Sequence, residues 1–383
     1  MSTLTALASG AALVALAAQA VTCAIAAWQC RPGRGRAVAP ARPPVSIVRP
    51  VCGIDHAAAE TLESTFHLAY PAYEIIFCVS DAADPVVPLV ERLIAANPGR
   101  PARLLAGRDR YPFNPKLDNC AKGWEAARHD WIVMSDSNLM LPPDYLDRIM
   151  ARAEASTGIV SAPPIGGETG NFWAEVEAGV LNTYQARIQY AVDACGLGFA
   201  QGKTLAMRRS VLDRAGGYAA MGTEPAEDAA ATKAVRRLGL NVRLARPPFM
   251  QPLGVRSARS VWARQVRWAR LRRATFPLLF APEILSGLLA PLLLLAVACH
   301  GAGWPMLPVL LGFAVAWYAC EAALARIAGW PLTVRSPMAW LVRDAALPAV
   351  WFAAWAGRSF SWRGHSLEAV ASQSTRPGMS PAE

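Results

Sequence analysis

Near its N-terminus the chain has a long stretch, residues 4–28, that carries no charged side chain. A transmembrane helix needs about 20 predominantly apolar residues, so this stretch is long enough to cross a bilayer. The alternative is a cleaved signal peptide, which has its basic residues before the apolar core. Here the basic residues follow the core, at Arg31, Arg34, Arg36 and Arg42. The positive-inside rule therefore predicts a membrane anchor at 4–28, with the residues that follow in the cytoplasm.

The C-terminal part of the chain is also apolar. Residues 284–299 and 306–325 are candidate spans, whereas a third stretch, 338–356, is interrupted by Arg343 and Asp344. The basic tail favours a cytoplasmic end, so we expect the third stretch to be interfacial, re-entrant or two short pieces. Together with the composition, 54% hydrophobic and only 17% charged, these stretches disfavour a wholly soluble protein. We expect a C-terminal membrane region over 284–362 and a disordered tail over 366–383.

The charge is basic and comes almost entirely from arginine. The net charge is +10, and only four of the 38 basic residues are lysines. Such a chain can attract anionic lipid, phosphate-bearing ligands or nucleic acid. Its eight cysteines form no CxxC pair, which disfavours a disulfide framework or a zinc site and indicates a reducing compartment.

Between the apolar ends, residues 45–256 alternate between strand and helix patterns after a Pro-, Gly- and Arg-rich linker at 31–44. Strands are predicted at 45–49, 74–79, 102–106, 131–134 and 199–207, and helices at 57–69, 85–97, 114–128, 171–194, 211–216 and 227–238. This alternation predicts an α/β fold with a mostly parallel, doubly wound sheet. Such sheets bind ligands beyond the carboxyl ends of their strands, where Asp81 and Asp136 are expected.

The acidic residues at these strand ends are the first candidates for chemistry, because the chain has no GxGxxG, P-loop, GxSxG or HExxH motif. Asp81 could accept hydrogen bonds from a nucleotide base or ribose, or could simply cap a turn. Asp136, with Asn138 two residues further on, offers hard oxygen ligands for a divalent metal such as Mg²⁺ or Mn²⁺. The alternative for Asp136 is an ordinary Asx turn.

Two predicted helix starts carry further candidates. Asn114 is a good N-cap, and Lys116 in the first turn opposes the helix dipole unless an anion is held there. A solvated lysine is the alternative. Glu227 and Asp228 open another helix, where they either complement the dipole or supply a general base, Asp228.

An arginine-rich segment, 257–280, precedes the C-terminal apolar region. Its composition is typical of an interfacial amphipathic helix on a membrane surface, with a soluble amphipathic helix as the alternative. Within it Arg264 and Arg267 share one helix face. Arginine forks suit a diphosphate, and Trp268 suits a sugar face or a bilayer interface, although charge against the membrane surface would also account for them.

Taken in order, Asp81, Asp136, Glu227-Asp228 and 264–268 resemble the D, D, D, (Q/R)xxRW series of inverting family-2-like glycosyltransferases with the GT-A fold. The chain resembles the ceramide glucosyltransferase family most closely, in its bacterial, family-21-like form. The segments that carry this resemblance are 45–50, 68–74, 78–81, 114–116, 226–228, 264–268 and 361–363. The resemblance implies a GT-A nucleotide-sugar-binding domain with N- and C-terminal transmembrane helices.

The resemblance also implies residue roles, as follows. Asp81 would bind the uridine of a UDP-sugar, Asn114 and Lys116 would line the nucleotide pocket, and Asp136 with Asn138 would hold a divalent metal, Mg²⁺ or Mn²⁺. Asp228 would be the catalytic base, Arg264, Arg267 and Trp268 would hold the diphosphate and close the acceptor site, and Gly202, Lys203 and Glu227 would lie on the acceptor side. Two departures stand out: the metal motif is Asp-Ser-Asn rather than Asp-x-Asp, and residues 183–190 contain no histidine.

The expected activity is transfer of one hexose, glucose by preference, from a UDP-sugar to a ceramide-type lipid. Alternatives are a diacylglycerol or hopanoid acceptor, a processive polysaccharide synthase, which would need more spans, and a non-catalytic sugar-nucleotide binder. Nucleic acid is not an expected partner, because the arginines cluster beside apolar spans and no nucleic-acid module is recognisable. The Arg-rich, Lys-poor composition indicates a GC-rich bacterial genome, and in a bacterium the membrane would be the cytoplasmic one. The sequence leaves the sugar, the acceptor and the oligomeric state open.

Overall fold

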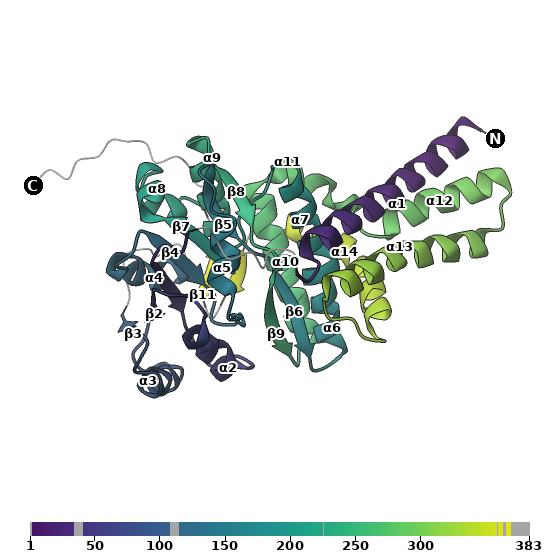
Figure 1. Ribbon diagram of the computed structural model, residues 1–383. Helices are drawn as coiled ribbons and strands as arrows, with labels where there is room; N and C mark the ends of the chain where they lie inside the picture. The colour runs from purple at the N-terminus through teal and green to yellow at the C-terminus, as the bar shows by residue number, and fades with distance from the viewer. Residues whose placement is uncertain are drawn as a thin grey trace, which may run out of the picture.

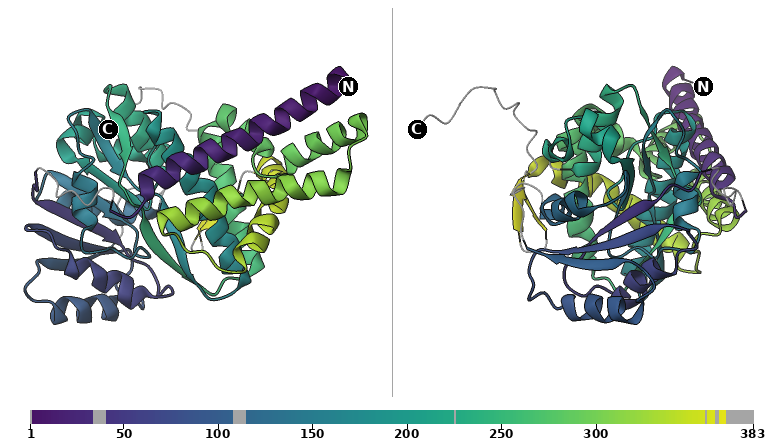
Figure 2. Two further views of the ribbon diagram at one scale, coloured as in Figure 1. Left: turned by 45° about the vertical axis from the view of Figure 1, so that its right-hand side comes forward. Right: turned by 60° about the vertical axis from the view of Figure 1, so that its left-hand side comes forward.

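The computed structural model describes residues 2–33, 41–107, 115–224, 226–357, 359–362 and 365–368. An α/β domain forms one side of the molecule, and three long helices project from the other side (Figure 1). The N-terminus lies at the far tip of these helices, away from the sheet (Figures 1 and 2).

A seven-stranded mixed sheet in the order β3-β2-β1-β4-β7-β5-β8 is the framework of the α/β domain. The strands are β1 (Val45–Pro50), β2 (Tyr73–Val79), β3 (Ala102–Ala106), β4 (Trp131–Ser135), β5 (Thr157–Ser161), β7 (Thr204–Arg208) and β8 (Asn241–Leu244). β3, β2, β1 and β4 are parallel, which confirms that part of the sequence prediction. β7 runs antiparallel to both β4 and β5, and β8 is parallel to β5, so the sheet is mixed and mostly parallel, as predicted.

Helices cover both faces of the sheet, because the central strands are buried on both sides. On one face Ile47 and Phe77 pack with α2 (Ala58–Glu63), η1 (Ser64–His67), α3 (Val87–Ala96) and α5 (Tyr145–Met150). On the other face Val48 and Ile76 pack with α4 (Pro115–Ala126), α8 (Arg209–Arg214) and α9 (Glu227–Arg237). Burial of a large apolar side chain such as Ile47 or Phe77 stabilises the fold by about 1.5–3 kcal/mol. Strands that are buried on both faces therefore have continuous apolar sequences.

A long helical rod lies between the sheet and the projecting helices. It comprises α6 (Phe172–Gly179), the π-helical segment η2 (Val180–Ala186) and α7 (Arg187–Ala194), which confirms the helix predicted at 171–194. A small parallel sheet of β6 (Pro164–Thr169) and β9 (Phe249–Gly254) lies beside the rod. The 3-10 helix η3 (Tyr218–Gly222) precedes α9.

Within the described residues, two helices are long and apolar enough to cross a membrane: α1 (Thr3–Cys30) and α13 (Met306–Ala328). A bent pair would make a third span; it comprises α11 (Pro277–Phe280) with η4 (Ala281–Leu285), joined at a 46° bend to α12 (Leu289–Ala302). α1 packs against both α12 and α13, and the three run side by side away from the sheet (Figures 1 and 2). The molecule therefore has the helices of a membrane-associated protein.

The arginine-rich helix α10 (Ala258–Thr275) packs against α14 (Ser336–Ala356) and α6, and most of its residues are half-buried. Its place on a membrane surface, expected for 257–280, stays a prediction.

α14 is one continuous helix, so the expectation of two short pieces is wrong. Arg343 and Asp344 do not interrupt it because both are buried and paired, as described below. The C-terminal region expected over 284–362 ends in strand rather than helix: β10 (Ser359–Trp362) pairs with β11 (His365–Glu368). The predicted disordered tail, 366–383, thus begins inside β11, and the rest of it lies outside the described residues.

Candidate active site

Five charged side chains meet at the carboxyl end of the central strands. They are Lys116 in the first turn of α4, Asp136 directly after β4, Lys203 directly before β7, and Glu227 and Asp228 at the start of α9. Lys116 Nζ lies 2.8 Å from Asp136 Oδ1 and 2.8 Å from Glu227 Oε1. It also donates to the carbonyl oxygen of Gly202 at 2.5 Å. Lys116 is therefore the hub that joins the two acidic sites predicted from the sequence.

The second lysine, Lys203, completes the pairing of Asp136. Its Nζ lies 2.9 Å from Asp136 Oδ2 and donates to Asn138 Oδ1 at 2.9 Å. Burial alone would raise the pKa of Asp136, but the ammonium groups of Lys116 and Lys203 outweigh it and hold that pKa well below its usual range. Asp136 is thus a permanent anion at neutral pH, in contact with two cations.

Asp228 has a different environment from Asp136. Its Oδ2 accepts a hydrogen bond from the backbone N–H of Gly202 at 2.8 Å, and its Oδ1 accepts one from Ala229 at 2.8 Å. Burial, followed by the neighbouring charge of Glu227, raises the pKa of Asp228 to about 6. A carboxylate with this pKa is ionised at neutral pH yet basic enough to accept a proton, as a general base requires.

A buried arginine that the sequence analysis did not identify holds the loop that carries Asp136. Arg49 on β1 is fully buried, and its Nη2 donates to the carbonyl oxygens of Asp136 at 2.8 Å and Leu139 at 3.0 Å. Its Nη1 donates to the carbonyl oxygen of Thr61 at 2.7 Å. Arg49 therefore fixes the loop that carries Asp136. The available signal was a charged residue inside an otherwise apolar strand, which is rarely tolerated unless it is paired.

The other predicted donor-side residues are placed less completely. Asp81 follows β2 at the expected edge of the sheet and is exposed; its Oδ1 accepts a hydrogen bond from the backbone N–H of Ala83 at 2.9 Å. This hydrogen bond is the turn-capping contact that the sequence analysis gave as the alternative role of Asp81. The Asp81 carboxylate is nevertheless exposed to solvent. Asn114 lies outside the described residues.

The arginine–tryptophan motif lies on α10. Arg264 forms an ion pair with Glu177 of α6. Trp268, one turn further on, packs against an apolar cluster formed by Ala174, Ala178, Leu181 and Leu253. The charge of Arg264 also reaches Lys203: burial lowers the pKa of Lys203, and the positive charge of Arg264 adds to that lowering. The charge of Arg264 therefore acts on Lys203. Arg264 and Arg267 are both half-buried.

The chemistry of the donor set determines whether a divalent cation fits. Asp136 and Asn138 supply one carboxylate and one amide oxygen, both hard ligands of the kind that Mg²⁺ and Mn²⁺ prefer. In the part of the chain that the structure describes, no group of three His, Cys, Asp or Glu side chains is arranged to hold a metal. The residues fit a cation that takes its remaining ligands from phosphate and water.

Gly202 provides a direct test of the cluster geometry. A Cβ atom at this position would lie 2.8 Å from Glu227 Oε1 and 3.2 Å from Lys116 Nζ, so a side chain would push the hub apart. We expect Gly202→Ala to lower turnover by on the order of 10²-fold, as misplacement of catalytic groups by about 1 Å does. Gly99→Ala is the control, because nothing lies within 4 Å of a Cβ at Gly99. Equal activity of the two variants would show that the cluster is not used in turnover.

The fold of this chain is similar to that of a solved sugar transferase. The mannosyltransferase PcManGT from Pyrobaculum calidifontis, solved in complex with GDP-Man and Mn²⁺, superimposes with a TM-score of 0.50 at 19% identity, covering 91% of this chain and 98% of that one. This likeness shows a GT-A-like, nucleotide-sugar transferase fold, with apolar helices at both ends of the chain.

The sequence comparisons identify the family. The profile of Glycosyl transferase family 21 matches residues 10–374, so the chain belongs to that family and is a glycosyltransferase. Ceramide glucosyltransferase 3 from Caenorhabditis elegans is 26% identical over 330 residues, covering 84% of this chain and 72% of the relative. Ceramide glucosyltransferase 1 from the same organism is 29% identical over 267 residues, covering 69% of this chain and 57% of the relative. The resemblance to this family inferred from the motifs is confirmed.

Proposed function

We propose that this protein is a membrane-bound inverting glycosyltransferase that transfers one hexose, glucose by preference, from a UDP-sugar to the hydroxyl of a ceramide-type lipid. The observation that carries the proposal is the half-buried cluster around Lys116, in which Asp228 has the pKa of a general base. Family membership and the names of the relatives support the donor and acceptor classes. The candidate spans α1 and α13 support a lipid acceptor, because they would hold the site next to a bilayer.

In the proposed reaction, Asp228 takes the proton of the acceptor hydroxyl while the hydroxyl oxygen attacks the anomeric carbon. The bond from that carbon to the diphosphate breaks, and UDP leaves with the electron pair. Lys116, Lys203 and Arg264 are cations around this point, and they stabilise the developing negative charge. A single in-line displacement inverts the anomeric centre, so a UDP-α-sugar gives a β-glycosyl lipid.

The remaining residues take roles around this step. Asp81 would bind the uridine end, and Asn114 would line the same pocket. Glu227 and Gly202 would lie toward the acceptor, and Arg267 with Trp268 would close the site above the diphosphate. Lys203 was expected on the acceptor side; its contacts with Asp136 and Asn138 favour the diphosphate side instead.

Asp136 with Asn138 would hold a divalent cation, Mg²⁺ or Mn²⁺, which when bound neutralises part of the diphosphate charge. Lys116 and Lys203 each engage one oxygen of Asp136, so a cation held there would compete with at least one of these ammonium contacts.

The proposed orientation follows from the helices that leave the α/β domain. The C-terminal end of α1 and the C-terminal end of α13 both lie on the side of the domain, while the N-terminus and the α12–α13 connection lie at the far tip (Figure 2). With Arg31 at the domain end of α1, the positive-inside rule puts the catalytic domain in the cytoplasm. We propose the bacterial cytoplasmic membrane as its location.

The test is mass spectrometry of lipids made by membranes that contain the protein. UDP-glucose, UDP-galactose or UDP-glucuronate is supplied with ceramide or diacylglycerol, in Mg²⁺, Mn²⁺ or EDTA. A hexosyl ceramide formed only with the protein supports the proposal, and loss of product in EDTA supports the metal. Product with diacylglycerol alone would favour the alternative acceptor. UDP binding without product from any pair would favour a non-catalytic sugar-nucleotide binder.

The pH dependence of turnover reports on the base. Because Asp228 must be ionised to accept a proton and has a pKa of about 6, kcat/KM is expected to rise with pH up to about 6 and then level off. The neighbouring charge of Glu227 helps to raise this pKa, so Glu227→Gln is expected to move the acid limb to lower pH. A pH–rate profile of both proteins measures the shift. An unmoved or alkaline-shifted limb in the variant would argue against Asp228 as the titrating base.

A further inference from the structure

Glu177 on α6 is a fully buried carboxylate to which the sequence motifs assign no role. Its side chain has 0% exposure, and each of its oxygens faces an arginine. Arg264 Nη1 contacts Oε1, and Arg256 Nε lies 3.4 Å from Oε2. Breaking a buried pair of this kind leaves an uncompensated charge, so Glu177, Arg256 and Arg264, here called the triad, hold one another in place.

The triad is fixed to the backbone on both sides. Asn171, the N-cap of α6, accepts a hydrogen bond from the backbone N–H of Arg256 at 3.1 Å and donates to its carbonyl oxygen at 2.8 Å. One turn beyond Arg264, Trp268 packs against the apolar cluster that includes Ala174 and Ala178 of α6. α6 and α10 are thus locked together at the point where Glu177 meets Arg264.

Glu177, Arg256 and Arg264 together carry one positive charge in excess. Arg264 is 23% exposed, and its charge is among those that lower the pKa of Lys203. A guanidinium has five N–H donors in a rigid fork, so one contact through Nη1 does not use up its capacity to bind an anion. The arrangement suits a diphosphate approaching Lys203 from the side of α10.

We propose that Glu177 is a positioning residue: it holds the guanidinium of Arg264 in the orientation that meets the diphosphate of the sugar nucleotide. This inference rests on the proposed function, because it takes a UDP-sugar as the donor. Glu177 touches no reacting atom and acts through Arg264 alone.

The sign of the effect separates positioning from simple electrostatics. Removing a negative charge near the site would by itself strengthen the binding of an anionic diphosphate. If Glu177 positions Arg264, its loss must weaken binding instead. We therefore expect Glu177→Gln to raise the Kd for UDP about tenfold, the equivalent of one charge-assisted hydrogen bond, with no change in the KM for the lipid acceptor.

Isothermal titration of the full-length protein in detergent with UDP measures this effect. Glu175→Gln is the matched control, since Glu175 is a buried acid on the same helix whose carboxylate accepts hydrogen bonds from Thr169 and Ser336. Glu177→Asp keeps the charge of the triad and only withdraws the carboxylate, so it should also weaken UDP binding if Glu177→Gln fails to fold. In an Arg264→Ala background, Glu177→Gln should cause no further loss.

Unchanged or tighter UDP binding in Glu177→Gln and Glu177→Asp would overturn the inference, as would a loss that adds fully to that of Arg264→Ala. Equal weakening in Glu175→Gln would also overturn it, by showing a general effect on α6. These results are independent of turnover. Wild-type protein that binds UDP but makes no glycolipid would refute the proposed function, while the UDP affinities would still decide the role of Glu177.

Discussion

Asp228→Asn is expected to lower glycolipid formation by about 10²–10⁴-fold, the contribution typical of a general base, while the affinity for UDP stays at the wild-type value. Asparagine has the shape of aspartate and can still accept a hydrogen bond from the backbone N–H of Gly202. It cannot take a proton from an attacking hydroxyl. The loss should therefore appear in kcat and not in donor binding, and lipid mass spectrometry together with UDP titration measures both.

Asp130→Asn is the matched control for this variant. Asp130 also accepts a hydrogen bond from a backbone N–H at a helix start, from Ser210 at 2.9 Å, but it is exposed and lies at the opposite end of β4 from Asp136. The Asp130→Asn variant should retain full activity. If Asp228→Asn kept wild-type turnover, Glu227 would be the remaining carboxylate to examine as the base. A parallel loss of UDP affinity would instead assign Asp228 to donor binding.

Part of the cluster could be predicted from the sequence, because strand ends and helix starts are readable locally and the family resemblance assigned these residues to one site. Asp136 after a strand and Glu227-Asp228 before a helix lie at the same edge of a parallel sheet, and the structure joins both to Lys116. The role of Lys203 was not readable. It depends on β7 running antiparallel beside β4, and the strand predicted at 199–207 gave no direction.

Strands β5 and β8 were not predicted, for a related reason. β5 and β8 are only a few residues long and lie far apart in the sequence, so their pairing is decided by tertiary packing and not by local pattern. The same holds for the buried charges. From the sequence alone, a single glutamate in a helix is expected to be exposed. The structure shows that Glu177 is buried because Arg264 of α10 pairs with it.

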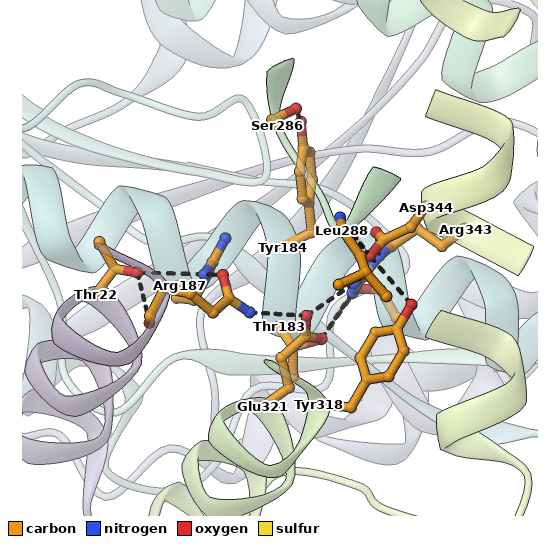
Figure 3. Close-up of polar contacts among 12 residues, drawn as sticks. Thr22, Thr183, Tyr184, Arg187, Ser286, Leu288, Tyr318, Glu321, Arg343 and Asp344 are labelled. Carbon is orange, nitrogen blue, oxygen red and sulfur yellow. Dashed lines mark hydrogen bonds and ion pairs between the residues drawn. The ribbon is translucent and has the colours of Figure 1, made fainter. Parts of the chain in front are cut away.

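The interruption of the last apolar stretch by Arg343 and Asp344 was interpreted as a break, whereas the structure shows a buried polar network (Figure 3). Arg343 is 2% exposed and binds the carboxylate of Glu321 on α13 through Nη1 at 2.9 Å and Nη2 at 2.8 Å. Its Nε donates to Asp344 Oδ1 at 2.8 Å. Asp344 Oδ2 in turn accepts from the backbone N–H of Leu288 at 3.1 Å, at the bend before α12.

The network also reaches the helical rod and the N-terminal helix. Arg343 Nη1 donates to Thr183 Oγ1 of η2 at 3.0 Å. Glu321 accepts a hydrogen bond from Gln19 of α1 at 3.0 Å, and Gln19 in turn contacts Arg187 of α7. With Arg187 and Arg343 against Glu321 and Asp344, the four charges sum to zero, which is the condition for placing them in an apolar region. The network therefore joins α1, α13 and α14 to the rod that carries Glu177.

Arg343→Met is accordingly expected to lower the free energy of unfolding by about 3–5 kcal/mol, because it leaves Glu321 and Asp344 buried without their shared partner. Thermal unfolding of the detergent-solubilised protein measures the loss. Arg335→Met, in the exposed turn before α14, is the control and should change stability by no more than about 0.5 kcal/mol.

The double variant Arg343→Met, Glu321→Leu restores charge neutrality, since Asp344 and Arg187 then remain as the only members of the four. It should recover part of the stability that the single variant loses, because removing both partners of a buried pair costs less than removing one. A double variant less stable than Arg343→Met would show that the hydrogen bonds of Glu321 to α1 and η2 matter more than the balance of charge. A single variant as stable as wild type would mean that α14 is held to α13 by apolar packing alone.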